Sequence, residues 1–206
     1  MKKIFILIII LAGLTRLQAQ TVSFYVQADA DDWQLFMSNQ AVTDLQSGGK
    51  TVFITLTAGD EGNNTAAFNG SAVPYYLARE NGAVFAAKFG WDMLQTTVNT
   101  TAVPVIQTVT INTHSLKKYV YGNTVTYFLR LPDGNTNGNG FLATANKSLK
   151  KLKAGTIPSI AAIDGTTTYT SWGDLTLTIA TIINTERGLN AQVLSLIHIS
   201  EPTRPY

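Results

Sequence analysis

Two short runs of β-branched and aromatic residues, each leading through a polar loop into a helical pattern, constrain the fold of this chain most strongly. Residues 22–26 and 51–57 have the length and composition of strands, and the first is apolar enough for burial on both faces. Apolar residues at helical spacing follow Asp32, and residues 75–89 have a second helical pattern. A strand–helix–strand–helix order with short connections predicts an α/β unit with a mostly parallel sheet.

The rest of the chain adds further strands and one more helix. Residues 103–111 and 125–131 are predicted strands, and residues 119–121 are a candidate third. Residues 172–186 repeat apolar positions with the period of an amphipathic helix, which Gly188 is placed to end. We find no internal repeat and no linker in the sequence, so we expect one domain.

Residues 1–19 have the pattern of a secretory signal peptide. Lys2 and Lys3 precede an apolar run over residues 4–14, and Ala19 offers a small residue for cleavage. The run is shorter than the roughly 20 apolar residues that span a bilayer. We therefore expect an exported protein, periplasmic or secreted, with no stable membrane span after signal cleavage; an uncleaved anchor is the alternative. The lack of cysteine excludes a lipoprotein anchor and a disulfide framework.

The charge balance argues against nucleic acid as a partner. The chain has 15 Lys and Arg and 13 Asp and Glu residues, and the signal segment holds three of the basic ones, which leaves 12 against 13. A protein that binds DNA or RNA needs a dense basic surface, and the sequence contains no Lys/Arg-rich stretch to form one.

The end of the chain has a sequence that is foreign to the domain. Residues 194–204 look like a translation of the transposon adapter used in sequencing libraries. We interpret residues 194–206 as a non-native tail, so His198 is not considered as a ligand. The domain over residues 20–193 is accordingly expected to be a fragment, incomplete at its C-terminus, of a protein that continues beyond Val193.

Three acidic residues follow the first predicted strand, at Asp29, Asp31 and Asp32. Open α/β sheets bind ligands beyond the carboxyl ends of their strands, and clustered carboxylates in a cleft favour a cation or protons. Oxygen ligands alone suit Mg²⁺, Mn²⁺ or Ca²⁺, whereas zinc usually takes at least one imidazole. The alternative is a solvated acidic turn that caps the following helix. From these residues alone both interpretations stay open.

Two motifs give the chain a resemblance to a known family. Residues 28–33 read Ala-Asp-Ala-Asp-Asp-Trp, and residues 57–62 read Thr-Ala-Gly-Asp-Glu-Gly. They resemble the Ala-His-Pro-Asp-Asp-Glu and Thr-x-Gly-Asp/Glu-x-Gly motifs of the PIG-L/LmbE family of zinc-dependent N-deacetylases, which are GlcNAc-PI de-N-acetylase-like. Residues 78–80 and 128–134 are similar to that family's Arg/Glu-bearing helix and its Leu-Pro-Asp-Gly segment. The resemblance implies a three-layer, Rossmann-like α/β fold.

The resemblance also implies roles for single residues. Asp31 matches the family's general base, and Asp32 matches a zinc ligand. Asp29 stands at the position of the family's histidine ligand, and a carboxylate there favours harder cations, so Zn²⁺ or another divalent cation is implied. Arg79, in the segment similar to the family's Arg/Glu-bearing helix, is the candidate to hold a substrate hydroxyl or phosphate, with an exposed helix arginine as the alternative. The family's last histidine ligand has no counterpart before Val193, as a truncated domain predicts.

The implied activity is hydrolysis of an N-acetyl group on an amino sugar or glycoconjugate. A metal activates water and polarises the carbonyl, and a carboxylate accepts the proton. The partner is then a small-molecule or glycan substrate. We expect the parent protein to be the enzyme and the present fragment to be inactive or weakly active. The alternative is an exported, non-catalytic carbohydrate-binding protein that kept the fold and lost the zinc site at residue 29.

A polar loop offers a second candidate site. Asp133, Asn135 and Asn137 match the first positions of an EF-hand-like calcium loop, but the twelfth position is Thr144 and not a bidentate glutamate. Asn and Gly residues also form ordinary turns, and a calcium-dependent surface adhesin would rest on this loop alone. His114 lies among polar and basic neighbours, so we expect it to be exposed in a loop.

Overall fold

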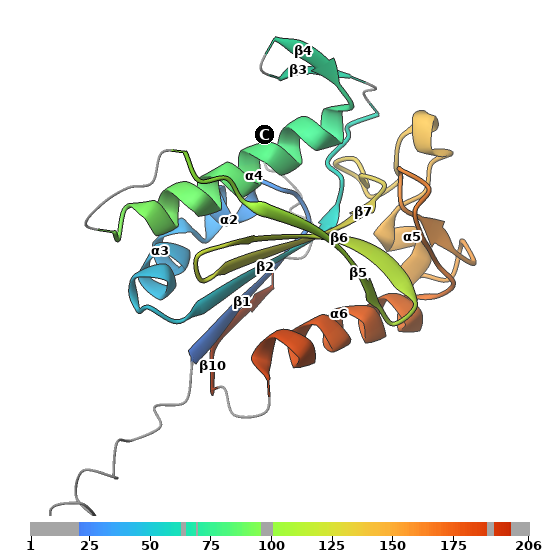
Figure 1. Cartoon of the computed structure of the whole chain (residues 1–206). Coiled ribbons are helices and arrows are strands. Elements are labelled where there is room, and N and C mark those ends of the chain that lie inside the picture. Colours follow the sequence, from blue (N-terminus) through green and yellow to red (C-terminus); the bar gives the residue numbers. More distant parts are fainter. Residues whose placement is uncertain (1–20, 63–64, 69, 96–100, 189–191, 199–206) are drawn as a thin grey trace, which may run out of the picture.

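The computed structural model describes residues 21–62, 65–68, 70–95, 101–188 and 192–198 (Figure 1). Its centre is a six-stranded sheet in the order β10-β1-β2-β7-β6-β5. These strands are β1 (Thr21–Gln27), β2 (Lys50–Thr57), β5 (Val105–Ile111), β6 (His114–Tyr121), β7 (Thr124–Leu131) and β10 (Gln192–His198). The pairs from β10 to β7 are parallel, whereas β6 pairs antiparallel with both β7 and β5. The expected α/β class is confirmed, with a mixed sheet that is parallel on one side.

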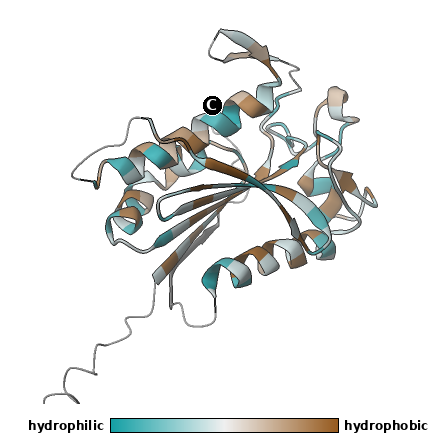
Figure 2. Cartoon of the chain, viewed as in Figure 1, coloured by the Kyte–Doolittle hydropathy of each residue, from teal (hydrophilic) through white to brown (hydrophobic). Residues whose placement is uncertain are grey.

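The middle strands of the sheet are buried over almost their whole length. Every residue of β7 and all but the first of β1 and β2 are buried. Such strands lie between two helical layers and need apolar residues on both faces, which explains their continuous hydrophobic runs. Figure 2 shows hydrophobic residues along these central strands. The strands predicted over residues 22–26, 51–57 and 125–131 are confirmed.

Helices cover both faces of the sheet. One face carries α2 (Asp32–Phe36), α3 (Ser38–Gln46) and α4 (Tyr75–Asp92), and the other carries α5 (Leu149–Lys153) and α6 (Trp172–Arg187) (Figure 1). A hydrophobic core lies on each face of the sheet. Alternate residues of one strand pack into different cores, because successive side chains point to opposite faces of the sheet. Tyr25 packs in a cluster with Trp33 of α2, whereas Phe24 shares a cluster with Leu175 of α6. The domain therefore has three layers.

Several local expectations were wrong in detail. The helix predicted after Asp32 is two helices, because the backbone at Met37 leaves the helical region with a φ of −126°. The candidate strand over residues 119–121 is the end of the eight-residue β6. Asn112 and Thr113 both have positive φ, 47° and 68°, and form the tight turn between β5 and β6.

His114 is buried, with 4% of its surface exposed, so the expectation of an exposed loop histidine was wrong. The tight turn places it at the first position of β6, opposite Ile111. Its Nε2 lies 3.0 Å from Asp174 Oδ1, and its ring stacks on Tyr169 with centroids 4.2 Å apart. His114 thus ties the β5–β6 hairpin to the start of α6.

Short elements complete the fold. They are the hairpins β3 (Ala66–Phe68)–β4 (Ser71–Val73) and β8 (Ile160–Ala161)–β9 (Thr168–Tyr169), and the 3-10 turn η1 (Leu142–Thr144). The expected signal peptide over residues 1–19 lies outside the described residues. Of the expected adapter-derived tail, residues 194–198 form part of β10, whose backbone pairs with β1. Among the described residues no helix has both the length and the apolar character needed to cross a membrane.

Candidate functional site

The carboxyl end of β1 is a topological switch point of the sheet. From β1 the chain crosses to β2 on one side, and β10 later pairs with β1 on the other side. The connections on the two sides of β1 therefore diverge, and open α/β sheets bind ligands in the crevice that this leaves. The turn with Asp29, Asp31 and Asp32 comes directly after this strand.

The two motifs singled out in the sequence meet at this edge. The backbone N–H of Thr57 donates to the carbonyl oxygen of Ala28 at 2.8 Å. The Thr57 hydroxyl lies 3.0 Å from the same carbonyl oxygen and donates to the Asp29 carboxylate. Gly59 in turn donates its N–H to the Thr57 hydroxyl at 3.3 Å. One threonine thus joins residues 28–33 to residues 57–62, because β1 and β2 are parallel neighbours that end side by side.

Asp32 is the most deeply buried acid of the turn, with 4% of its surface exposed. Its carboxylate accepts the N–H of Asp29 at 2.9 Å. Burial, reinforced by the negative charges of Asp29 and Asp31, raises the pKa of Asp32 to about 6. Asp31 stands at the N-cap position of α2, but its side chain makes no capping hydrogen bond. Side-chain capping of α2 by Asp31 therefore does not explain the acidic residues of this turn.

Arg79 is the cation that the turn faces. Its Nη2 lies 2.8 Å from Asp31 Oδ1 and 3.8 Å from Asp29 Oδ2, and its Nη1 lies 3.6 Å from Glu61 Oε1. Only 15% of the side chain is exposed, so Arg79 is not an ordinary surface arginine of α4. Its guanidinium lies against carboxylates from the ends of both β1 and β2.

A cavity of about 340 Å³ opens beside this cluster. Its lining residues are Ala30, Asp31, Gln34, Arg79, Gly82 and Ala83. Gln34 Oε1 and Arg79 Nε are buried, and neither atom has a hydrogen-bond partner among the described residues. The side chains of Gln34 and Arg79 thus border the cavity, while each keeps one buried polar atom whose hydrogen-bonding capacity is unused by the described residues.

Two further acids belong to this site, although no role in it was predicted for either of them. Asp60 follows β2, and its Oδ1 accepts the backbone N–H of Asp133 at 3.1 Å. Burial and the nearby charge of Asp29 raise the pKa of Asp133. Asp133 follows the predicted strand over residues 125–131, so the strand-end rule that selected Asp29 also points to it.

The remaining atoms of the candidate calcium loop form turns. Asp133 Oδ1 accepts the N–H of Asn135 at 2.8 Å, and Asn137 Oδ1 accepts the N–H of Asn139 at 2.8 Å. The Asn137 carbonyl oxygen accepts a hydrogen bond from Lys150 Nζ. Thr144, the twelfth position, donates its hydroxyl to the Phe141 carbonyl oxygen. These oxygens are thus engaged in hydrogen bonds within and around the loop, and calcium binding stays a prediction.

The acidic turn offers oxygen ligands, but the set is incomplete. Within the ranges that the structure describes, no group of three or more His, Cys, Asp or Glu side chains is arranged to hold a metal ion. Asp29 and Asp32 can supply two carboxylates, and Asp32 is buried without an ion pair to any side chain that the structure describes, which favours a positive ligand. Further ligands would have to come from outside this turn, and Arg79 would have to move away from Asp29.

No family model, no curated protein and no solved structure matches this chain. The family resemblance of residues 28–33 and 57–62 therefore stays a prediction. The structure itself establishes an α/β domain with a cavity, lined by Asp31 and Arg79 among others, beside the turn that follows β1.

Proposed function

We propose that this chain carries the N-terminal part of the active site of an exported, metal-dependent N-deacetylase of the PIG-L/LmbE type. In this proposal the domain is Rossmann-like, and its substrate is an N-acetylated amino sugar or glycoconjugate. The observation that carries the proposal is the junction of the two motifs through Thr57 at the switch point of the sheet. Two sequence matches that are remote along the chain become one site only if the fold brings them together there.

In this proposal the three acids of the turn have separate roles in the hydrolysis. Asp29 and Asp32 would hold the cation, which when bound lowers the pKa of water and polarises an amide carbonyl. Asp32 has a pKa raised to about 6, so it would give up a proton on holding a cation in acid solution. Asp31 borders the cavity and would accept a proton from the attacking water.

Arg79 and Gln34 would position the sugar. The side chains of Arg79 and Gln34 line the cavity with Asp31. The guanidinium can donate hydrogen bonds to a sugar hydroxyl and the amide of Gln34 can accept one. Arg79 also holds Asp31 on the side of the cavity through their 2.8 Å contact.

The first test is metal binding, measured by isothermal titration calorimetry of the full chain with Zn²⁺ and with Mn²⁺. We expect binding that is lost in Asp32→Asn and kept in Asp44→Asn, a control acid that bonds Tyr25 instead. Asp29→His restores the family's imidazole, so it should tighten Zn²⁺ binding by on the order of tenfold. Equal binding by all variants would refute the proposed metal site.

A second test addresses the chemistry. The Asp29→His chain, loaded with Zn²⁺, is incubated with an N-acetylglucosamine conjugate, and acetate release is measured. We expect slow release that disappears in the Asp29→His/Asp31→Asn double variant, since the amide of asparagine cannot accept the proton. Release that is unchanged by Asp31→Asn would contradict the role of this residue.

A non-catalytic carbohydrate-binding protein is the second candidate. It is favoured by the position of Arg79, whose guanidinium already contacts the carboxylates of Asp29 and Asp31. This function predicts that an N-acetylated sugar binds in the presence of a chelator, and that Gln34→Leu weakens this binding. Sugar binding that requires the metal would instead support the enzyme.

A further inference from the structure

Arg130 has a backbone conformation that side chains rarely adopt. It lies next to the end of β7, and its φ is 56°, in the left-handed region, where Cβ crowds the backbone. The pairing of β7 with β2 shifts at the same place, between Thr55 and Thr57 of β2. Over this step β2 advances by two residues and β7 by three, from Phe128 to Leu131, which makes a bulge. The bulge thus lies beside Thr57, the residue that joins the two motifs.

Arg130 is buried, with 7% of its surface exposed, and its side chain connects separate parts of the fold. Its Nε and Nη2 donate to the two carboxylate oxygens of Glu80 on α4, at 2.6 and 2.7 Å. Its Nη1 pairs with Asp164, in the connection between β8 and β9. The guanidinium also lies over the ring of Tyr76, with Cζ 5.0 Å from the ring centroid. Strained backbone persists where surrounding contacts hold it, and it gathers at functional sites, so Arg130 is a candidate for a role in the site.

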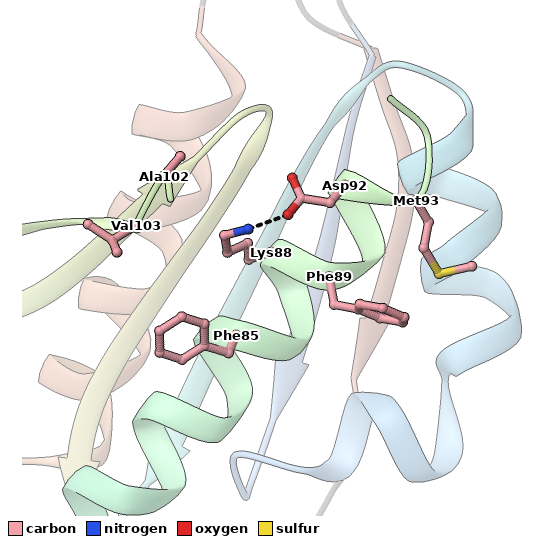
Figure 3. A pocket seen from close by; sticks show the side chains of 7 residues that line it. All are labelled: Phe85, Lys88, Phe89, Asp92, Met93, Ala102 and Val103. Atoms are coloured by element: carbon pink, nitrogen blue, oxygen red, sulfur yellow. Dashed lines mark hydrogen bonds and ion pairs between the residues drawn. The ribbon is translucent and has the colours of Figure 1, made fainter. Parts of the chain in front are cut away.

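The two halves of α4 are held by separate ion pairs. Asp92, in the last turn, pairs with Lys88 and accepts the hydroxyl of Tyr121 at 2.8 Å. This pair lies in a mostly apolar groove of about 410 Å³ between α4 and the segment that leads into β5 (Figure 3). Glu80 lies nearer the start of the helix and is held by Arg130. Loss of the Glu80 contact should therefore loosen the first half of α4 while the second half stays in place.

Arg79 precedes Glu80 in the chain and has little freedom in the site. Its Nη2 lies 2.8 Å from Asp31 Oδ1, and its guanidinium packs against the backbone of Gly59. A Cβ at Gly59 would lie 2.5 Å from Arg79 Nε, so only glycine leaves room for the guanidinium there. A small shift of α4 toward β2 would therefore press Arg79 onto Gly59, and a shift away would break the contact with Asp31.

We propose that Arg130 is a positioning residue of the candidate site. It holds Glu80, and thereby the first half of α4, where Arg79 faces the acidic turn and the cavity. A bidentate pair between guanidinium and carboxylate has a defined geometry, so it fixes the helix more precisely than a single hydrogen bond would. The placement of Arg79 depends on this chain alone, whereas its use in sugar binding rests on the proposed function.

The first test measures the placement of Arg79 in the full chain without a ligand. Phenylglyoxal modifies guanidinium groups, and peptide mass spectrometry gives the rate of modification at each arginine. Arg79 should react slowly in the wild type, because its side chain is only 15% exposed and is paired with carboxylates. Glu80→Gln keeps the size of the side chain but removes the charge that pairs with Arg130, so it should speed the modification of Arg79 by at least about fivefold. The exposed Arg187 is the reference site in each sample.

Asp92→Asn is the matched control, because it makes the same carboxylate-to-amide change in the other ion pair of α4. It should leave the modification rate of Arg79 unchanged. Arg130→Lys keeps the positive charge but cannot make the bidentate contact, so it should expose Arg79 in the same direction as Glu80→Gln. This variant decides the question also where Glu80→Gln does not fold. Unchanged reactivity of Arg79 in the folded variants, or an equal increase in Asp92→Asn, would overturn the proposal.

A second measurement separates positioning from a general loss of stability. Calorimetry compares Glu80→Gln with the wild type for binding of Zn²⁺ and, in the Zn²⁺-loaded chain, of N-acetylglucosamine. Affinity for the sugar should fall by about tenfold, because Arg79 is displaced. Affinity for Zn²⁺ should not fall, because Asp29 and Asp32 lie on a different element. Equal losses of both affinities would overturn the proposal. A wild type that binds neither ligand would refute the proposed function instead, and the modification rates would still decide whether Arg130 places Arg79.

Discussion

Replacement of Asp32 by asparagine tests the electrostatics of the acidic turn most directly. Asparagine keeps the shape of the side chain and can still accept the 2.9 Å hydrogen bond from the N–H of Asp29. It removes the ionisation of a buried carboxyl whose pKa is raised from 3.8 to about 6. The folded protein therefore holds this proton more tightly than the unfolded chain does.

The sign of the pH dependence follows from this difference. Below about pH 4 both states are protonated at Asp32, and above about pH 6 both are ionised. Between these values the folded state binds more protons, so this residue makes folding less favourable as the pH rises. A shift of about two pH units corresponds to at most about 3 kcal/mol. Water that reaches the turn screens part of this cost, so we expect about 1–2 kcal/mol.

The measurement is thermal unfolding of the wild type and Asp32→Asn, with a chelator present, from about pH 4 to about pH 7.5. We expect equal stability at the acid end and a variant more stable by about 3–6 °C at the neutral end. Other titrating groups, including Asp133, are common to both proteins and cancel in the comparison. A difference that does not change with pH, or a variant less stable near neutrality, would refute the reasoning.

Three further substitutions test packing and local backbone geometry, each by urea unfolding. Glu80→Ala leaves the buried Arg130 without its bidentate partner, at 2.6 and 2.7 Å, and should cost about 3 kcal/mol or more; a loss below about 1 kcal/mol would contradict the pairing. Thr113→Gly relieves a β-branched residue at a φ of 68° and should stabilise the protein by about 1 kcal/mol, whereas the same change at exposed Thr110 should destabilise it. Ser171→Ala removes the hydroxyl that accepts the N–H of Asp174 at the start of α6 and should cost about 1 kcal/mol, which Ser171→Asp should largely restore.

The central strands could be predicted because burial on both faces leaves a continuous apolar signal in the sequence. Strand β6 was predicted only at its end, because the turn before it is made by Asn112 and Thr113 without the glycine that usually marks such turns. The burial of His114 could not be anticipated either, because it depends on Asp174 and Tyr169 from a remote part of the chain. Local sequence carries no information about partners of that kind.

The candidate site was likewise predictable from the sequence only in part. The position of Asp29, Asp31 and Asp32 at a strand end followed from the order of the elements. The contact of Arg79 with Asp31 spans 48 residues, and the approach of Asp133 to Asp60 spans 73. Both depend on how α4 and β7 pack, which the pattern of apolar residues does not specify.

The change from parallel to antiparallel pairing at β7 has a consequence for the order in which the domain folds. Strands β5, β6 and β7 are consecutive and joined by tight turns, so their contacts are local and should form early. Strand β1 can pair only with segments that lie far along the chain, β2 on one side and β10 on the other. Such long loops close slowly, because their entropy is lost before contacts compensate. The carboxyl end of β1 should therefore be among the last parts of the molecule to become ordered, so that the acidic turn takes shape only after the rest of the sheet has formed.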